Sequence, residues 1–447
     1  MDINFSELNR CNVYAVPVGS YFKKENNKCY LVYSPLSNVF FLSLPDEVDK
    51  LEQLLKEGER NNALNALLNQ PVVSGELPGE NYDTFCTLHL LLNEKCNFHC
   101  KYCYSAEGRS SVELPMEQIH IMLDYFLSSE RSAVKERTVM FMGGGEPVLS
   151  WAKLEKSTLL AEEIALRNGV NLHLSLTTNC SVLTDDMLDF LKVHNFTVQI
   201  SFEVLPDVQN EQRGMNDVVA SNLNKLVDAG ISNYVRSTIT AANVDRIPEM
   251  VEYCQTHFPG VKKLSCQHVV DPGYFTSIEI VNDFFDRYFK SFMAATELAL
   301  RTGLQLRSSS SHLINYSKRE KFCYNLVCLT PHGTLTTCPD VSSPQETDYV
   351  RSVFAKIEDG RIIFDDATFS RLTEGSIHTI GKCRNCWARW NCGSGCPSSR
   401  RVYSPEIFDS ICDFYRRMLC HSLMSELAAK YQKATNKDFY MDIASKL

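Results

Sequence analysis

The sequence has 447 residues, 44% of them apolar, which is enough to bury a large core in roughly two or three domains. A formal net charge of −9 argues against a surface built mainly to attract nucleic acid or anionic lipid. The first residues, MDINFSELNR, lack the features of an export signal, and no stretch reaches the roughly 18 apolar residues of a membrane span. We therefore expect a cytoplasmic protein without nucleic-acid or membrane partners.

The first 83 residues are expected to form a short α+β region. Two runs typical of β-strands, residues 12–22 and 28–44, precede a helical pattern over residues 45–68. The segment that follows, residues 73–84, is rich in Gly, Pro and Asn and is typical of a linker.

From Thr84 onward, strands and helices alternate. The expected strands are residues 84–93, 137–147, 171–179, 196–204, 233–240 and 262–270. The expected helices are residues 116–129, 151–168, 184–193, 215–229 and 245–257, followed by a long helix over 280–302. This order predicts an α/β fold with a parallel sheet, either open and doubly wound or closed into an incomplete barrel.

Ligands of such sheets bind at the C-terminal ends of the strands. Residues Cys96–Cys103, the glycines after Met142, Asn179 and Glu203 all follow the ends of expected strands. We therefore expect these residues to form one site.

The chain contains 18 cysteines, which is unusual for a long sequence without an export signal. In a reducing compartment, clustered cysteines are better explained as metal ligands than as disulfides. The clusters lie at residues 96–103, 323–338 and 383–412, and the region after residue 323 is otherwise rich in Gly and turn residues, with a closing helix over 410–431. The scattered cysteines are expected to be small buried hydrophobic residues.

The first cluster, Cys96, Cys100 and Cys103, is one thiol short of a closed four-ligand site. Three thiolates on a 4Fe-4S cluster leave one iron open to a small chelating substrate. A zinc site completed by His99 or by a distant residue is the alternative. The next expected strand ends in MGGGEP, a stretch of bare backbone that lacks the Lys and Ser/Thr of a P-loop.

CNFHCKYC followed by GGGEP resembles the radical S-adenosylmethionine (SAM) enzymes. The resemblance implies a partial (β/α)6 TIM-like barrel over residues 84–310, with a 4Fe-4S cluster on these three cysteines and SAM on the open iron. It also implies SAM contacts at the strand ends: Tyr102 beside the adenine, Gly144, Gly145 and Glu146 at the methionyl amino group, Asn179 near the ribose, and Ser201 and Arg213 at the carboxylate. Strand-end capping or a surface salt bridge is an alternative role for the last three.

The C-terminal cysteines show a second pattern. Cys323, Gly333 and Cys338 have C-x9-G-x4-C spacing, and a C-x2-C-x5-C-x3-C group with a distal cysteine follows. The second group alone also fits a zinc knuckle. The whole set resembles the SPASM extension of radical SAM enzymes, which implies two auxiliary 4Fe-4S clusters in residues 311–447. The implied ligands are Cys323, Cys328, Cys338 and Cys396 for one cluster, and Cys383, Cys386, Cys392 and Cys412 for the other.

These resemblances imply an oxidoreductase that cleaves SAM to a 5′-deoxyadenosyl radical and modifies a ribosomally made peptide through a thioether or carbon-carbon cross-link. Its partners would be a precursor peptide or protein substrate and an electron donor such as flavodoxin or ferredoxin. Residues 1–83 loosely resemble a leader-peptide recognition domain. The alternatives are an anaerobic sulfatase maturase that forms formylglycine, and a non-enzymatic iron-sulfur or zinc-binding protein.

Asp340 is the candidate catalytic base. Forming a thioether or an aldehyde requires loss of a proton as well as a hydrogen atom, so a base is expected near the substrate. Sulfatase maturases have an Asp directly after the cysteine that matches Cys338, whereas here Pro339 intervenes. Capping of a turn after Pro339 is the alternative role.

Overall fold

The computed structural model describes residues 5–22, 29–70, 81–131, 134–308, 318–323 and 325–446. These residues form a three-stranded sheet near the N-terminus and a separate eleven-stranded sheet. Within the described ranges, no helix combines the length and the apolar character that a membrane crossing requires.

The N-terminal sheet is antiparallel, in the order β1-β2-β3, where β1 is Tyr14–Pro17, β2 is Tyr30–Ser34 and β3 is Val39–Ser43. The expectation of two strands was wrong, because the second run folds into a hairpin whose turn ends at Asn38 in left-handed backbone. The predicted helix is likewise two helices, since Gly58 ends the first one with a φ of 73°. The helices of this region are α1 (Ser6–Arg10), η1 (Gly19–Phe22), α2 (Pro45–Glu57) and α3 (Asn62–Leu68). Most of the predicted linker lies outside the described residues.

The second sheet contains all six strands that the sequence predicts, and neighbouring strands run parallel. They are β4 (Thr87–Leu90), β5 (Glu136–Phe141), β6 (Asn171–Thr178), β7 (Thr197–Ser201), β8 (Asn233–Ile239) and β9 (Lys263–His268). A seventh parallel strand, β10 (Gln305–Ser308), extends the sheet beyond β9. The α/β prediction is therefore confirmed.

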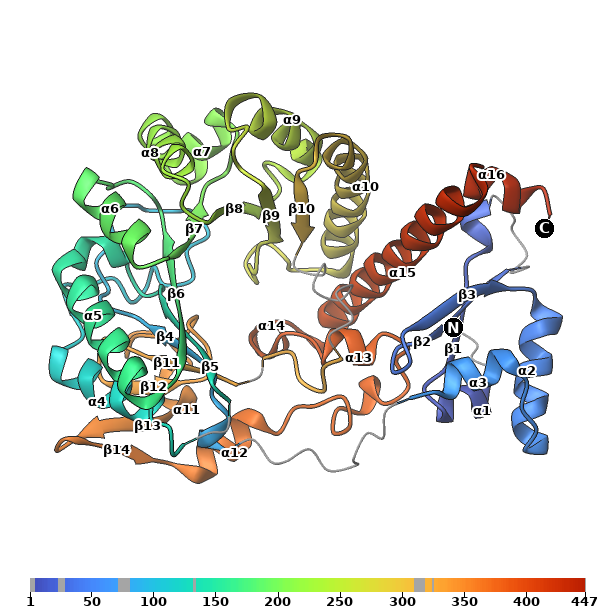
Figure 1. Ribbon diagram of the computed structural model, residues 1–447, viewed down its shortest axis with the longest axis horizontal. Helices are drawn as coiled ribbons and strands as arrows, with labels where there is room; N and C mark the ends of the chain where they lie inside the picture. Colours follow the sequence, from blue (N-terminus) through green and yellow to red (C-terminus); the bar gives the residue numbers. More distant parts are fainter. Residues whose placement is uncertain are drawn as a thin grey trace.

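Helices cover the outside of this curved sheet, as Figure 1 shows. They are α4 (Met116–Phe126), α5 (Trp151–Asn168), α6 (Asp185–Val193), α7 (Pro206–Gln212), α8 (Asn216–Asp228), α9 (Ile247–His257) and α10 (Ile278–Thr302), with 3-10 turns η2 (Tyr82–Thr84), η3 (Pro147–Ser150) and η4 (Val244–Arg246). The sequence pattern missed α7, which is too short to show a helical period. The arrangement is that of a partial TIM-like barrel, whose inner face lies opposite the helices.

In the region after residue 323, where the sequence predicts only a closing helix, four further strands are present. Strand β11 (Leu326–Leu329) pairs parallel with β4 and continues the barrel sheet past its first strand. Three antiparallel strands follow it: β12 (Thr334–Thr336), β13 (Val353–Glu358) and β14 (Arg361–Phe364). The cysteine-rich region is thus built onto the edge of the barrel.

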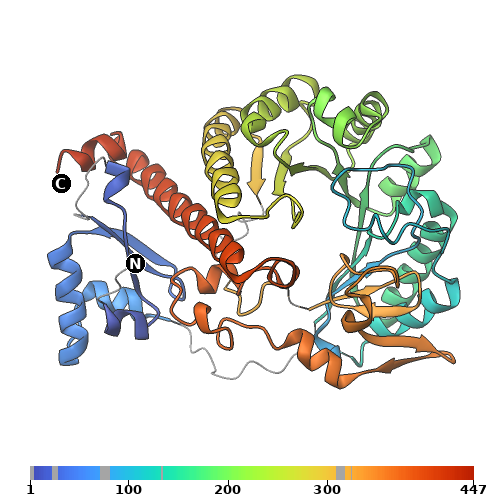
Figure 2. The ribbon, with the colours of Figure 1, turned by 180° about the vertical axis from the view of Figure 1, so that it is seen from behind.

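The remaining elements are mostly short helices: α11 (Tyr349–Ser352), α12 (Asp366–Thr373), η6 (Gly381–Cys383), α13 (Arg389–Cys392), α14 (Pro397–Val402), α15 (Pro405–Thr435) and α16 (Phe439–Ala444). The long helix α15 runs from the barrel to the N-terminal sheet (Figures 1 and 2). Its Phe414 stacks on Phe285 of α10 with ring centroids 4.4 Å apart.

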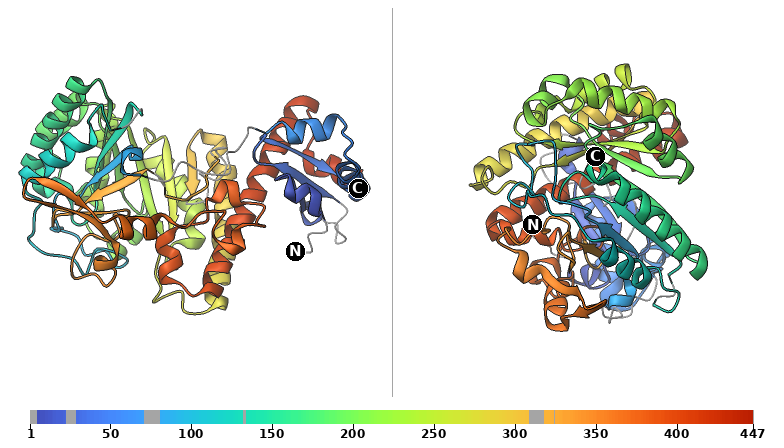
Figure 3. Two further views of the ribbon diagram at one scale, coloured as in Figure 1. Left: turned by 90° about the horizontal axis from the view of Figure 1, so that it is seen from below. Right: turned by 90° about the vertical axis from the view of Figure 1, so that its left-hand side faces the viewer.

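The N-terminal sheet forms one end of the molecule (Figure 3). One face packs on its own helices through Val32, Val48 and Leu64. The other face joins the main core, and the Tyr33 hydroxyl there donates a buried hydrogen bond of 2.9 Å to the side-chain oxygen of Asn391. This region is therefore anchored to the cysteine-rich region, although β1 and β3 remain the two edges of its sheet.

Candidate active site

The loop after β4 carries the first cysteine cluster across the C-terminal ends of the barrel strands. The amide nitrogen of Gly145 donates to the carbonyl of Asn93 at 2.8 Å, and that of Glu146 donates to the carbonyl of Lys95 at 2.6 Å. A Cβ atom at Gly145 would lie 2.0 Å from the Lys95 carbonyl oxygen. Only glycine permits this approach, which explains the bare backbone of the MGGGEP motif.

The Glu146 side chain ties the end of β5 to the end of β6. Its carboxylate accepts hydrogen bonds of 2.7 Å from the Thr178 hydroxyl and from the Asn179 amide nitrogen. Burial raises the pKa of Glu146, and these donors act in the opposite direction. The Asn179 side chain in turn donates to Asn97 at 3.0 Å and lies 3.9 Å from the Cys96 sulfur. The structure thus brings Gly145, Glu146 and Asn179 to the first cysteine cluster.

The three thiols of this cluster are half-buried. Burial raises the pKa of Cys100 and of Cys103, so binding of a metal would release protons from these groups. The Arg109 guanidinium donates to the Cys103 sulfur at 3.1 Å. Sequence reasoning missed Arg109, because its position six residues after the last cysteine belongs to no spacing that the motif defines.

Tyr102 and Arg213 meet at Glu203, which follows β7 and is fully buried. The Tyr102 hydroxyl donates to the Glu203 carboxylate, and Arg213 donates to the Tyr102 oxygen at 3.0 Å. The Ser237 hydroxyl and the Thr238 amide nitrogen, both on β8, also donate to this carboxylate. Burial raises the pKa of Glu203, while the nearby Arg213 lowers it. This network fixes the rim of the site on the side of β7 and β8.

Ser201 ends β7 on the inner face of the barrel, where its strand neighbour in register is Arg236. Among the described residues, no hydrogen bond joins Ser201 to Arg213. The pairing of these two residues at one ligand group therefore stays a prediction.

Four of the C-terminal cysteines lie together beside the barrel. Cys323, Cys338 and Cys396 line one pocket. The pKa of Cys338 is raised by burial, then by Asp340, and then by the nearby thiols of Cys396, Cys328 and Cys323. Cys328 lies on β11, and its sulfur is 3.8 Å from Nδ1 of His89 on the adjacent strand β4. These are the four residues that the family resemblance assigns to one auxiliary cluster.

The other four cysteines form a second group. The pKa of Cys392 is raised by burial and then by the thiols of Cys412, Cys386 and Cys383. Burial raises the pKa of Cys412 to about 11, and the nearby Lys382 and Arg416 act to lower it. Arg400 lies close to thiols of both groups. The thiols that favour its charged form are Cys383 and Cys392 of this group and Cys396 and Cys323 of the other.

The residues present fit iron-sulfur clusters, because cysteine thiolates are the usual ligands of such clusters. Within the described parts of the chain, no three His, Cys, Asp or Glu side chains converge tightly enough to hold one metal ion.

Asp340 lies between the first cluster and the C-terminal cysteines. Burial raises the pKa of Asp340, while the Arg236 charge and hydrogen bonds to Cys338 and Ser398 lower it. The same carboxyl is a neighbour of Tyr104, which also lies near Cys103. Asp340 sits in a turn closed by a hydrogen bond from the Val341 amide to the Cys338 carbonyl at 3.3 Å. Its position satisfies both the catalytic and the turn interpretation.

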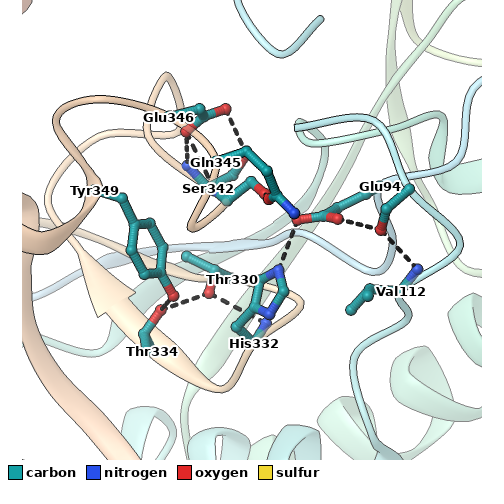
Figure 4. Close-up of polar contacts among 11 residues, drawn as sticks. Glu94, Val112, Thr330, His332, Thr334, Ser342, Gln345, Glu346 and Tyr349 are labelled. Carbon is teal, nitrogen blue, oxygen red and sulfur yellow. Dashed lines mark hydrogen bonds and ion pairs between the residues drawn. The ribbon is translucent and has the colours of Figure 1, made fainter. Parts of the chain in front are cut away.

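A polar network that the sequence did not predict joins the loop after β4 to the C-terminal region (Figure 4). The buried Glu94 carboxylate is 2.7 Å from Nε2 of His332 and accepts from the Ser110 hydroxyl. Beside it, the Glu346 carboxylate accepts from the Ser342 amide nitrogen at 2.7 Å. The loop after β4, which carries the first cysteine cluster, is thus held from both sides. The glycines of the MGGGEP motif contact it on one side, and the residues around β12 contact it on the other.

Comparison with known proteins shows one family match. Residues 90–254 match the Radical SAM superfamily. The match includes the three cysteines of the first cluster and the strands from β5 to β8. It supports the enzyme interpretation over the non-enzymatic alternative.

Two individual relatives are maturation proteins. The chain is 29% identical over 195 residues to the sporulation killing factor maturation protein SkfB of Bacillus subtilis, covering 42% of this chain and 43% of SkfB. It is 22% identical over 374 residues to a cysteine-type anaerobic sulfatase-maturating enzyme of Clostridium novyi, covering 77% of this chain and 94% of that enzyme. The match to SkfB thus spans less than half of that relative's length.

One solved structure shares the fold over most of the chain. The Streptococcus suis protein SuiB, bound to its precursor peptide SuiA, aligns with a TM-score of 0.53 and 13% identity, covering 88% of this chain and 98% of SuiB. At this identity the likeness concerns the fold.

Proposed function

We propose that this chain is a radical SAM peptide maturase with two auxiliary iron-sulfur clusters. The observation that carries the proposal is the combination of one three-thiol group beside Glu146 and Asn179 with two four-thiol groups in the same chain. The corresponding regions are residues 1–83, the SAM-cleaving barrel of residues 84–310 and the cluster-binding residues 311–447. The similarity to a killing-factor maturation protein and to a sulfatase-maturating enzyme supports a peptide or protein substrate.

When bound, the first cluster and SAM would supply an electron and a 5′-deoxyadenosyl radical that abstracts hydrogen from an unactivated carbon. The chain's own residues would hold and orient the reactants. Cys96, Cys100 and Cys103 would bind the cluster, and Arg109 would donate to one of its sulfurs. Glu146 would accept from the methionyl amino group, while Asn179 and the Tyr102–Glu203–Arg213 network would fix the remainder of SAM. Asp340 would take the substrate proton.

An anaerobic sulfatase maturase is the second candidate. It is favoured by the Clostridium novyi enzyme, because that relative aligns over nearly its whole length. The N-terminal sheet bears on the choice, since an open sheet edge such as β3 can bind an extended peptide by strand addition. A truncated chain without residues 1–70 would distinguish leader binding from a simple packing role for this region.

Iron content and SAM cleavage test the proposal together. Anaerobically reconstituted protein should carry about twelve irons and form 5′-deoxyadenosine when reduced in the presence of SAM. Replacement of Cys96, Cys100 and Cys103 by Ala should abolish 5′-deoxyadenosine formation and leave about eight irons bound. Stoichiometric zinc with about four irons would remove the auxiliary clusters from the proposal, and persistent cleavage in the triple variant would refute the radical site.

A further inference from the structure

The inner wall of the barrel carries three basic side chains on adjacent strands. On β8, β9 and β10 the side chains alternate, and Val235, Leu264 and Leu306 pack into the core under the helices. The residues between them therefore face inward. These inward residues include Arg236 on β8, Lys263 on β9 and Arg307 on β10.

Strand register places two of these cations in one row. Ser201, Arg236, Ser265 and Arg307 are successive neighbours across β7, β8, β9 and β10. Parallel strands lie about 4.8 Å apart, so the row runs roughly 14 Å along the wall from Ser201 to Arg307. Lys263 lies one layer below, with its ammonium 3.9 Å from the ring centre of Tyr234.

None of the three cations forms an ion pair with a described carboxylate, although Asp340 lies near Arg236. In the portion of the chain covered by the structure, none of them has an Asp or Glu oxygen within the 4.0 Å of an ion pair. Burial and the charge of Arg307 lower the pKa of Lys263, as expected for like charges held together. Like charges on one wall oppose each other, and the chain as a whole is acidic with a net charge of −9. An unpaired basic wall inside an acidic protein attracts and retains an anion.

The row also adjoins the proposed reaction centre. Arg236 is close enough to Asp340 to lower the pKa of that carboxyl, and it is a neighbour of Tyr104 as well. A group held on this wall would thus lie beside the proposed base. Arg307 and Lys263 are two strands or more from Ser201, the residue expected at the SAM carboxylate.

We propose that Arg236, Lys263 and Arg307 form a subsite that binds a carboxylate side chain of the substrate, an Asp or Glu close in sequence to the residue that is modified. The subsite rests on the proposed function, because it assumes a peptide in the barrel. It selects substrates by charge before any chemistry occurs. Guanidinium groups suit this task, since they bind carboxylates in a fixed, two-pronged geometry.

Two labelled peptides test the subsite in a binding assay that needs no turnover. Both are short Gly/Ser peptides with one central Cys, flanked by Glu in one peptide and by Gln in the other. Fluorescence anisotropy on the full-length, reconstituted protein should show at least about tenfold tighter binding of the Glu peptide, with the difference shrinking as salt is added. In Arg307→Gln and in Lys263→Met this preference should fall by about tenfold.

Arg301→Gln is the matched control, because Arg301 is exposed near the C-terminal end of α10 on the outside of the barrel. It should keep the full preference for the Glu peptide. Thermal unfolding and iron content of each variant exclude misfolding as the cause of a loss. Equal binding of the two peptides to the unsubstituted protein, or an unchanged preference in Arg307→Gln, would overturn the subsite.

A third result would also overturn it. If saturating SAM displaces the Glu peptide in simple competition, the row serves the carboxylate of SAM and not that of a peptide. The proposed function is judged separately, by 5′-deoxyadenosine formation in the unsubstituted protein. Charge-selective binding without SAM cleavage would leave the subsite standing and refute the function.

Discussion

Asp340 is the residue whose surroundings most clearly join the two halves of the site. Its carboxyl neighbours Arg236 of the barrel wall, Cys338 and Ser398 of the C-terminal region, and Tyr104 of the first cluster loop. Burial raises the pKa of Asp340, which makes its carboxylate a stronger proton acceptor than that of an ordinary Asp.

Replacement of Asp340 by Asn should lower the ratio of modified peptide to 5′-deoxyadenosine by about a hundredfold, the usual scale of acid-base catalysis. Acidification of the unsubstituted protein should also lower this ratio, because it protonates the base. Since burial raises the pKa of Asp340, the fall should occur at a higher pH than an ordinary Asp would give. Both quantities can be followed by mass spectrometry in one reaction. Asp359→Asn, in the exposed turn between β13 and β14, is the matched control. A normal ratio in Asp340→Asn would leave the residue with its turn role.

At the scale of elements, the loop after β4 depends on backbone contacts and on one charged group. Gly145 lets the end of β5 pass against Asn93 and Lys95. Glu113, near the end of this loop, binds Lys95 near its start at 2.9 Å, and it also binds Lys153 of α5 at 3.1 Å and the Ser150 hydroxyl of η3 at 2.7 Å. Each contact can be removed separately.

Gly145→Ala should displace the loop, because the new methyl group would lie 2.0 Å from a backbone oxygen that cannot rotate away. We expect a loss of roughly 2 kcal/mol or more in the free energy of unfolding and weakened SAM binding. Chemical denaturation and equilibrium dialysis measure the two effects. Gly381→Ala is the control, since nothing lies within 4 Å of a Cβ there. Equal behaviour of the two variants would contradict the steric explanation.

Glu113→Gln should lower stability in a manner that depends on pH. The hydrogen bonds from Lys95 and Ser150 are the main cause that lowers the pKa of Glu113 to about 2. Because the pKa of Glu113 is lower in the folded state, its ionised carboxylate stabilises the fold fully above pH 4.5, the ordinary pKa. This stabilisation is lost as the pH falls toward 2. The variant should therefore lose roughly 1–2 kcal/mol near neutral pH and progressively less below about pH 4.

Urea unfolding of Glu113→Gln at several pH values gives the test. Glu117→Gln serves as the control, because Glu117 is exposed and has no hydrogen bond or ion pair among the described residues. A stability loss in Glu113→Gln that stays constant from neutral to strongly acidic pH would show that the ionised carboxylate is not its cause.

At the scale of the whole molecule, the cysteine-rich region connects all other parts. Its strand β11 continues the barrel sheet, and its helix α15 packs on α10. Its Asn391 contacts the N-terminal sheet. Several of its helices have only four to six residues and cannot be stable by themselves. In the proposed function, binding of the auxiliary clusters would supply the missing stability.

Removal of iron should therefore loosen residues 381–412 more than the barrel strands. Hydrogen exchange of protein treated anaerobically with a chelator should show the largest gain in that segment and around Cys323–Cys338, with β5 to β8 largely protected. The barrel peptides act as the internal control. A uniform gain over the whole chain would mean that the clusters do not stabilise the C-terminal region locally.

The sequence by itself determined the local features of this protein. Hydrophobic periodicity located the six barrel strands, because it records which face of a segment is buried. The spacing of Cys96, Cys100 and Cys103 and the glycines of the MGGGEP motif pointed to a radical SAM domain, since their chemistry depends on short-range backbone geometry.

Only the tertiary structure decided which distant segments meet. Periodicity does not say which strand is the neighbour, so the pairing of β11 with β4 could not be derived from it. The network around Glu94 and the row of Arg236 and Arg307 both bring together residues far apart in sequence. Such contacts follow from strand register and packing, which depend on the whole chain at once.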